Sequence, residues 1–152
     1  MEREPAIPMI PPSNPTLRPN VSALLISPSE LDFDTLFEVF HNLNWKLQVA
    51  QSCRQALSAL NQCEFPVIVC EARLPDGNWR TVCAHLTGGP SQLIVTSRLA
   101  DERLWIDALD SGCYDVLTNP FRRAEALRVI TGAWLQYRIE SAANWRFQHI
   151  SA

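Results

Sequence analysis

Five short apolar runs alternate with five amphipathic segments along most of this chain, and this alternation constrains the fold more than any other feature. The apolar runs predict strands over residues 21–26, 45–50, 66–70, 92–96 and 114–118. The amphipathic segments predict helices over residues 29–44, from Ser52 onward, and over 78–86, 101–111 and about 122–143. Strands that alternate with helices form a parallel sheet covered on both faces. We therefore expect one α/β domain with a doubly wound, five-stranded parallel sheet.

Capping residues mark two of the predicted helix ends. Ser52 has the character of an N-cap, and Gln55 stands three residues later, where it completes a capping box. Gly112 follows the helix at 101–111 and is typical of a helix C-terminus. The dipeptide Asp76-Gly77 predicts a tight turn, to which we assign no further role.

The two ends of the chain differ from this central pattern. Residues 1–20 hold six of the eleven prolines and predict an extended N-terminal arm without a core of its own. We assign residues 21–140 to the folded domain and residues 141–152 to a C-terminal helical extension or tail.

The overall charge and the apolar runs exclude several classes of protein. A net charge of −3 argues against a general nucleic-acid binder, so no direct contact with nucleic acid is expected. The sequence has no run of about 18 apolar residues and no signal-peptide pattern at its start. We therefore expect a cytoplasmic protein that does not associate with membranes.

The cysteines and histidines show no spacing typical of a metal site or a redox motif. No two of the five cysteines form a C-x-x-C pair, and the three histidines are far apart. The cysteines are Cys53, Cys63, Cys70, Cys83 and Cys113, and the histidines are His41, His85 and His149. We interpret the thiols as small buried side chains and expect neither a metal nor another cofactor.

Polar side chains follow several of the predicted strands. In a doubly wound sheet, the working site lies at the carboxyl ends of the strands, beside the point where the strand order reverses. The residues at these ends are Ser27, Pro28, Glu71, Thr96, Ser97 and Asn119.

Two motifs at this edge resemble the receiver domain of two-component signalling. One is the Leu-Pro-Asp-Gly turn at residues 74–77, and the other is Gly-Cys-Tyr-Asp-Val-Leu-Thr-Asn-Pro-Phe at residues 112–121. The second is similar to the family's Gly-Ala-x-Asp-Tyr-Leu-x-Lys-Pro-Phe, and the likeness covers residues 21–140. It implies a flavodoxin-like (CheY-like) sheet with strand order 2-1-3-4-5, and a cis peptide bond before Pro120.

The resemblance also implies a phosphorylation site, and this chain lacks most of its residues. The acceptor Asp of the family corresponds to Glu71, its acidic pair to Ser27 and Pro28, its hydroxyl to Ser97, and its Lys to Asn119. Only the hydroxyl is kept. Mg²⁺ requires carboxylate oxygens, and phosphoryl transfer requires neutralised charge and accurate positioning. The chain therefore resembles a degenerate pseudo-receiver without Mg²⁺ and without phosphorylation.

Glu71 has two interpretations. Its longer carboxylate could place negative charge where the phosphoryl group would lie, within reach of Ser97, and so mimic phosphorylation. Alternatively, it is a solvated remnant at a strand end that accepts hydrogen bonds from nearby backbone. The adjacent Cys70 is expected to point into the core and not to act as a nucleophile. A phosphotransfer role for His85 is not expected.

A partner-binding face is expected where the helix at 101–111, the strand at 114–118 and the last helix meet. We expect Leu104, Ala108 and Leu109 to supply the buried stripe of the first helix, and Ile130 and Trp134 that of the last. The exposed apolar face would then comprise Trp105, Ile106, Val116, Val129 and Leu135. Val116 also replaces the aromatic residue that the family uses in switching. The alternative is that the C-terminal segment, with Trp145 and Phe147, folds back over this face.

These patterns predict a non-enzymatic, receiver-like signalling module that acts by binding a protein or a second copy of itself. One alternative is a functioning receiver that accepts a phosphoryl group on Glu71. Another is the N-terminal portion of a larger transcriptional regulator. A flavin or nucleotide site is not expected, because the loop Ser-Pro-Ser-Glu at residues 27–30 lacks glycine and carries a carboxylate.

Overall fold

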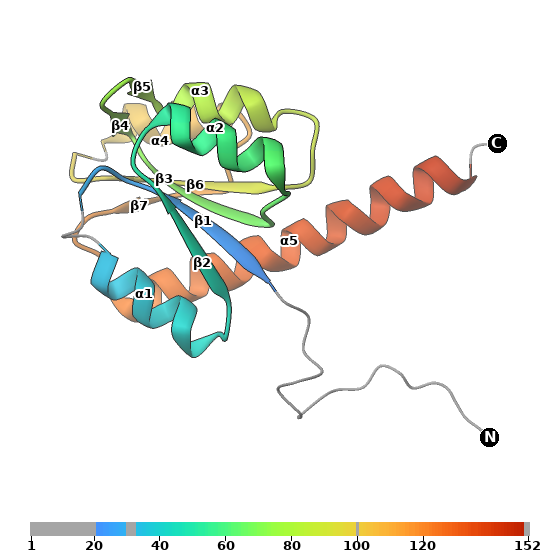
Figure 1. Cartoon of the computed structure of the whole chain (residues 1–152), viewed down its shortest axis with the longest axis horizontal. Coiled ribbons are helices and arrows are strands. Elements are labelled where there is room, and N and C mark those ends of the chain that lie inside the picture. Colours follow the sequence, from blue (N-terminus) through green and yellow to red (C-terminus); the bar gives the residue numbers. More distant parts are fainter. Residues whose placement is uncertain (1–20, 30–32, 100, 151–152) are drawn as a thin grey trace.

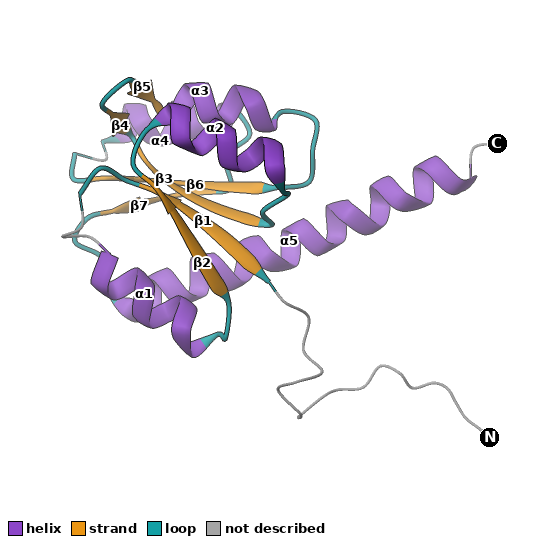
Figure 2. Cartoon of the chain, in the orientation of Figure 1, coloured by secondary structure: helices purple, strands orange, loops and turns teal. Residues whose placement is uncertain are grey.

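The computed structural model describes residues 21–29, 33–99 and 101–150, without the side chains of Phe33 and of residues 146–150. The expected N-terminal arm lies outside the described residues. Within them, helices cover both faces of one central sheet (Figures 1 and 2). No helix in these three ranges combines the length and the apolar character needed to cross a membrane.

The central sheet has the predicted architecture. Its strands run parallel in the spatial order β2-β1-β3-β6-β7. Their bounds are β1 (Ser22–Ile26), β2 (Lys46–Ala50), β3 (Val67–Glu71), β6 (Gln92–Ser97) and β7 (Asp115–Thr118). The expected five-stranded, doubly wound sheet of order 2-1-3-4-5 is therefore confirmed.

Three helices cover one face of the sheet: α2 (Cys53–Gln62), α3 (Trp79–Leu86) and α4 (Glu102–Asp110) (Figure 1). One face of α3 is turned to the core, since Trp79 and Val82 are buried and Cys83 and Leu86 pack against the same cluster. Ser52 caps α2 as expected, with its hydroxyl accepting from the Gln55 amide at 3.1 Å. The Gln55 side chain accepts from the amide of Gln51, so the reciprocal bond of a capping box is displaced by one residue.

Helices α1 (Phe33–Asn42) and α5 (Arg123–Ile150) cover the other face (Figure 1). The buried stripe of α5 includes Ile130 as predicted, but it also includes Val129, which is only 2% exposed. The prediction that Val129 faces outward is therefore wrong. A helix lying on a sheet buries a stripe more than 100° wide, so adjacent residues about 100° apart can both lie inside it.

Val116, of the expected interaction face, and Leu109, of the expected buried stripe, also behave differently from the prediction. Val116 is buried, because helices cover both faces of β7 and its side chain joins the cluster beneath α2, α3 and α4. Leu109 is 45% exposed instead of buried. Leu104 and Ala108 lie one helical turn apart and form the line along which α4 meets the core, and Leu109 lies about 100° further round.

The last helix is longer than predicted and continues beyond the sheet without a break (Figure 1). Before it leaves the domain, aromatic contacts hold it. The Trp134 ring lies 5.7 Å from that of Trp45 and 5.8 Å from that of Tyr137, measured between centroids. The Tyr137 hydroxyl donates to the carboxylate of Glu64. Trp145 is exposed on the continuous helix, so it does not fold back over α4; the side chain of Phe147 lies outside the described residues.

A glycine in α5 makes room for the aromatic ring that precedes β7. A Cβ atom added at Gly132 would lie 2.3 Å from the Tyr114 hydroxyl oxygen and 3.3 Å from its Cζ. Tyr114 packs in the cluster beneath α1 and α5. The absence of a side chain at residue 132 therefore allows α5 to approach the sheet closely at this point.

Candidate degenerate phosphorylation site

The predicted site residues meet at the carboxyl edge of the sheet. Ser27 follows β1, Glu71 ends β3, Ser97 ends β6 and Asn119 follows β7. Within the sheet, β3 pairs with both β1 and β6, and Glu71 is in register with Thr96. The parallel topology therefore brings together residues that are far apart in the sequence, as the sequence predicts.

Glu71 is bound by the neighbouring Ser27. The Ser27 hydroxyl donates to Glu71 Oε2 with an Oγ–Oε2 distance of 2.5 Å. The backbone amide of Ser29 in turn donates to the Ser27 hydroxyl at 3.2 Å. Ser27 is buried and Glu71 is partly buried. The bond is thus a short, charge-assisted hydrogen bond between the ends of β1 and β3.

The other two site residues make local contacts. The Ser97 hydroxyl accepts from the Leu99 amide at 3.1 Å. Asn119 is buried, and its amide donates to the Ser97 carbonyl at 2.9 Å. The peptide bond between Asn119 and Pro120 is cis, as the resemblance implied.

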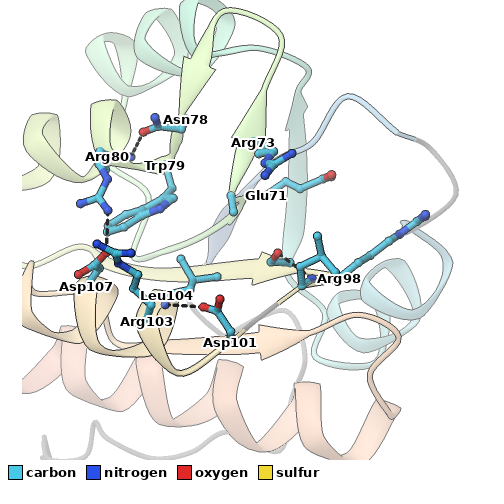
Figure 3. A pocket seen from close by; sticks show the side chains of 13 residues that line it. Glu71, Arg73, Asn78, Trp79, Arg80, Arg98, Asp101, Arg103, Leu104 and Asp107 are labelled. Atoms are coloured by element: carbon cyan, nitrogen blue, oxygen red, sulfur yellow. Dashed lines mark hydrogen bonds and ion pairs between the residues drawn. The ribbon is translucent and has the colours of Figure 1, made fainter.

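An open cavity of about 500 Å³ lies beside Glu71 and Ser97. Trp79 forms part of its wall, with the Arg80 guanidinium 4.7 Å above the ring centroid. Arg80 also pairs with Asp107 of α4 at 2.9 Å. Figure 3 shows the Arg80–Asp107 pair at one end of the cavity, and the Glu71 side chain is directed away from this pair. The cavity is further lined by Arg73, Arg98, Arg103 and Asp101, so its wall carries both signs of charge.

The residues at this edge do not fit a magnesium ion. Ser27 and Pro28 stand where the resemblance implies an acidic pair. The Ser27 hydroxyl donates to Glu71, and Pro28 has no side-chain ligand. One carboxylate remains where near-octahedral Mg²⁺ coordination uses several oxygens. Among the residues that the structure describes, no three His, Cys, Asp or Glu side chains are grouped to hold a metal ion.

The turn after β3 also makes contacts that the sequence did not predict. Residues 73–74 and 77–78 form a two-stranded antiparallel ladder, β4 (Arg73–Leu74) with β5 (Gly77–Asn78). The Asp76 carboxylate accepts from the amides of Cys53 and Arg54 at 2.8 and 3.0 Å. These bonds lower the pKa of Asp76. Asp76 therefore caps α2 from 22–23 residues away, a contact that turn propensity alone cannot reveal.

The remaining sequence candidates are placed as follows. Cys70 lies in the core, as predicted, and burial raises the pKa of its thiol far above the usual range. His85 is exposed on α3. Of the expected interaction face, Trp105, Ile106 and Leu135 are exposed, whereas Val116 and Val129 are not.

Solved structures of receiver domains match this fold. A signal receiver domain of an HD-domain-containing protein from Pseudomonas fluorescens matches at 23% identity and a TM-score of 0.74, covering 81% of this chain and 93% of its own. The beryllofluoride-activated NtrC4 receiver domain dimer matches at 23% identity and a TM-score of 0.71, covering 76% and 98%. The chemotaxis response regulator CheY4 of Vibrio cholerae matches at 14% identity and a TM-score of 0.67, covering 76% and 99%. No protein-family model and no curated protein matches by sequence. The chain therefore has the fold of a receiver domain.

Proposed function

We propose that this protein is a receiver-like module of two-component signalling that operates without phosphoryl transfer and acts by binding another protein. The observation that carries the proposal is the Ser27–Glu71 hydrogen bond. It joins the residue at the family's metal-binding position to the residue at its acceptor position, and it engages the carboxylate that would have to attack phosphorus.

The local geometry argues against both chemical steps at this edge. Attack requires a free carboxylate oxygen in line with a phosphoryl donor, and the developing charge requires a cation. Oε2 of Glu71 is bonded to Ser27, which restricts the orientation of the carboxylate and leaves only Oε1 for attack, and Asn119, buried after β7, cannot supply the positive charge of the family's Lys. We infer that the chain has no catalytic activity of this kind.

The same bond bears on the two interpretations of Glu71. Mimicry of phosphorylation calls for a carboxylate directed at Ser97, but the carboxylate is held by Ser27 and the Ser97 hydroxyl is held by the Leu99 amide. We favour a third role, in which Glu71 fastens the end of β3 to that of β1 and so keeps this edge in one conformation.

Binding is proposed to use the exposed apolar residues on α4 and α5. Ile106 on α4 and Leu135 on α5 are 53% and 56% exposed, and Trp105 and Leu109 lie on the same helix as Ile106. Exposed apolar groups of this size are typical of protein interfaces. We propose that a protein partner, or a second copy of the chain, binds at α4 and α5, with residues 21–140 as the folded unit that carries this face.

Acetyl phosphate with Mg²⁺, followed by intact mass measurement, tests the absence of phosphoryl transfer. We expect no addition of a phosphoryl group to the protein, whereas a receiver with the complete site, treated in parallel, gains one. Titration with Mg²⁺ alone, followed by amide chemical shifts near Glu71, should show no saturable change. A phosphoryl adduct on Glu71, or a saturable Mg²⁺ site of millimolar or tighter affinity, contradicts the proposal and favours a functioning receiver.

A further inference from the structure

Two cysteines that are 30 residues apart in the sequence have adjacent thiols. Cys83 lies on α3, and Cys113 lies in the turn between α4 and β7. Their Sγ atoms are 4.0 Å apart, and both side chains are free thiols. We propose that Cys83 and Cys113 are an oxidation site, at which a peroxide converts the two thiols into a disulfide.

The backbone on both sides of this pair is well held. Cys113 donates its amide to the Ala108 carbonyl at 2.9 Å, and the next amide, that of Tyr114, donates to the Leu93 carbonyl at 2.7 Å. On the other side, α3 is anchored by its buried Trp79 and Val82. The two sulfurs are therefore kept near each other by the fold, which supplies the proximity that an intramolecular reaction needs.

Only a small movement separates the pair from a bond. A disulfide has an S–S distance of about 2.05 Å, so the sulfurs must approach by roughly 2 Å. The Cys83 Sγ also lies 3.3 Å from the Ser111 carbonyl oxygen, which places it against the turn that carries Cys113. A change of rotamer at one or both cysteines is the rearrangement that the bond requires.

A small oxidant can reach Cys83 but not Cys113. A cavity of about 180 Å³ is lined by Cys83, by Ser111 and Gly112 of the turn, and by Gly88 and Gly89. Cys83 is partly exposed, whereas Cys113 is 6% exposed. Burial, and secondly the neighbouring Cys83, raise the pKa of Cys113. Cys83 is therefore the thiol that meets the peroxide, and Cys113 is the thiol that completes the disulfide.

The two steps balance with hydrogen peroxide as the oxidant. In the first step the Cys83 sulfur attacks one peroxide oxygen, so that an S–O bond forms, the O–O bond breaks and one water leaves. In the second step the Cys113 sulfur attacks the Cys83 sulfur, so that the S–S bond forms, the S–O bond breaks and a second water leaves. The two thiols together lose two electrons and two protons, which the peroxide takes up.

The disulfide would add a covalent link between α3 and the turn that follows α4. The closed loop runs from Cys83 through β6 and α4 to Cys113 and includes Ser97 and Ile106. Oxidation would thus tie α4, which carries part of the exposed apolar face, to α3. The chemistry at the two thiols does not depend on the proposed signalling function.

Peptide mapping after oxidation tests the site. The protein carrying Cys63→Ser, which removes an exposed thiol that could link two molecules, is treated with hydrogen peroxide, and the remaining thiols are alkylated. We expect two fewer alkylated cysteines than in the untreated protein, a peptide that joins Cys83 to Cys113, and full reversal by dithiothreitol. The matched control adds Cys113→Ala, which should yield no crosslink and leave oxygen adducts on Cys83.

If a variant folds poorly, the same peptide mapping on the unsubstituted protein decides the question. Oxygen adducts on Cys83 together with an alkylatable Cys113 would overturn the proposal, as would a crosslink that joins Cys83 or Cys113 to another cysteine of the same molecule. A crosslink that appears only after the protein is unfolded in urea would also overturn the proposal, because the folded protein would then not bring the two thiols together.

Discussion

The Ser27 hydroxyl donates to the Glu71 carboxylate across 2.5 Å, linking two strand ends that are 44 residues apart in the sequence. The resemblance to receivers implies metal-binding carboxylates at these two positions. Here a hydroxyl and a carboxylate are joined directly, so a contact within the protein holds this edge of the sheet together.

Removal of the Ser27 hydroxyl should destabilise the fold. Ser27→Ala leaves a partly buried carboxylate without its donor, and a charge-assisted hydrogen bond contributes about 1.5–3 kcal/mol. We expect the free energy of unfolding in urea to fall by about 1–3 kcal/mol. Glu71→Ala serves as the second single variant, and the double variant should cost less than the sum of the two. Additive losses would show that the two side chains do not interact in solution.

Substitution of Asp76 should destabilise α2 and change how the stability of the fold depends on pH in acid solution. Its pKa is lowered in the folded protein by the amides of Cys53 and Arg54. The stabilisation is therefore fully present above the unfolded-state pKa, about 3.9 for Asp, and is lost as the pH falls through the lower folded-state pKa. With Asp76→Asn, urea midpoints between pH 7 and pH 2 should decline less steeply at the acid end. An acid-side slope that Asp76→Asn leaves unchanged would contradict this role of Asp76.

Alanine should be unfavourable at Gly132, although it is ordinarily the better helix residue by about 1 kcal/mol. The added Cβ would lie 2.3 Å from the Tyr114 hydroxyl oxygen. We expect Gly132→Ala to lower the free energy of unfolding by about 1–3 kcal/mol, as overpacking does. In a Tyr114→Phe background the oxygen is absent and the nearest ring carbon is 3.3 Å away, so the same change should be close to neutral. An equal loss in both backgrounds would contradict the steric explanation.

Charged residues on the exposed apolar face should abolish binding without unfolding the domain. Ile106→Glu with Leu135→Glu alters two exposed side chains, so the melting temperature should remain near that of the unsubstituted protein. Phe37→Glu on α1 is the matched control, because Phe37 is also a partly exposed apolar side chain. Association is measured by sedimentation of the protein alone and by capture of partners. A monomer whose partner capture survives the double change would exclude this face.

Val129 provides the complementary test of helix phase. Val129 is buried on the inward side of α5, so Val129→Glu places a carboxylate in the core. The change should lower the free energy of unfolding by several kcal/mol. We expect a large fall in the urea midpoint, in contrast with Leu135→Glu on the same helix. Equal stability of the two variants would mean that α5 is rotated from the position described here.

The sequence predicted the sheet well, because five apolar runs leave few alternatives for a chain of this length. It also predicted which residues meet at the carboxyl edge, since parallel topology alone brings Ser27 and Glu71 together. It did not predict the bond between them, which depends on rotamers. The Asp76 cap and the proximity of Cys83 to Cys113 were missed because each depends on a contact between elements. Val129 and Leu109 were misassigned because periodicity gives the direction of a buried stripe but not its width.

The uninterrupted course of α5 has a mechanical consequence. At about 1.5 Å per residue, its 28 residues form a rod of roughly 42 Å, of which one part is clamped by Trp45 and Glu64 and the rest extends past the sheet. Because the helix is held near its middle, a slight tilt at that point moves its free C-terminal end through a larger distance. Rearrangements near Trp134 too small to alter the fold would therefore be amplified at the C-terminal turns, as by the long arm of a lever.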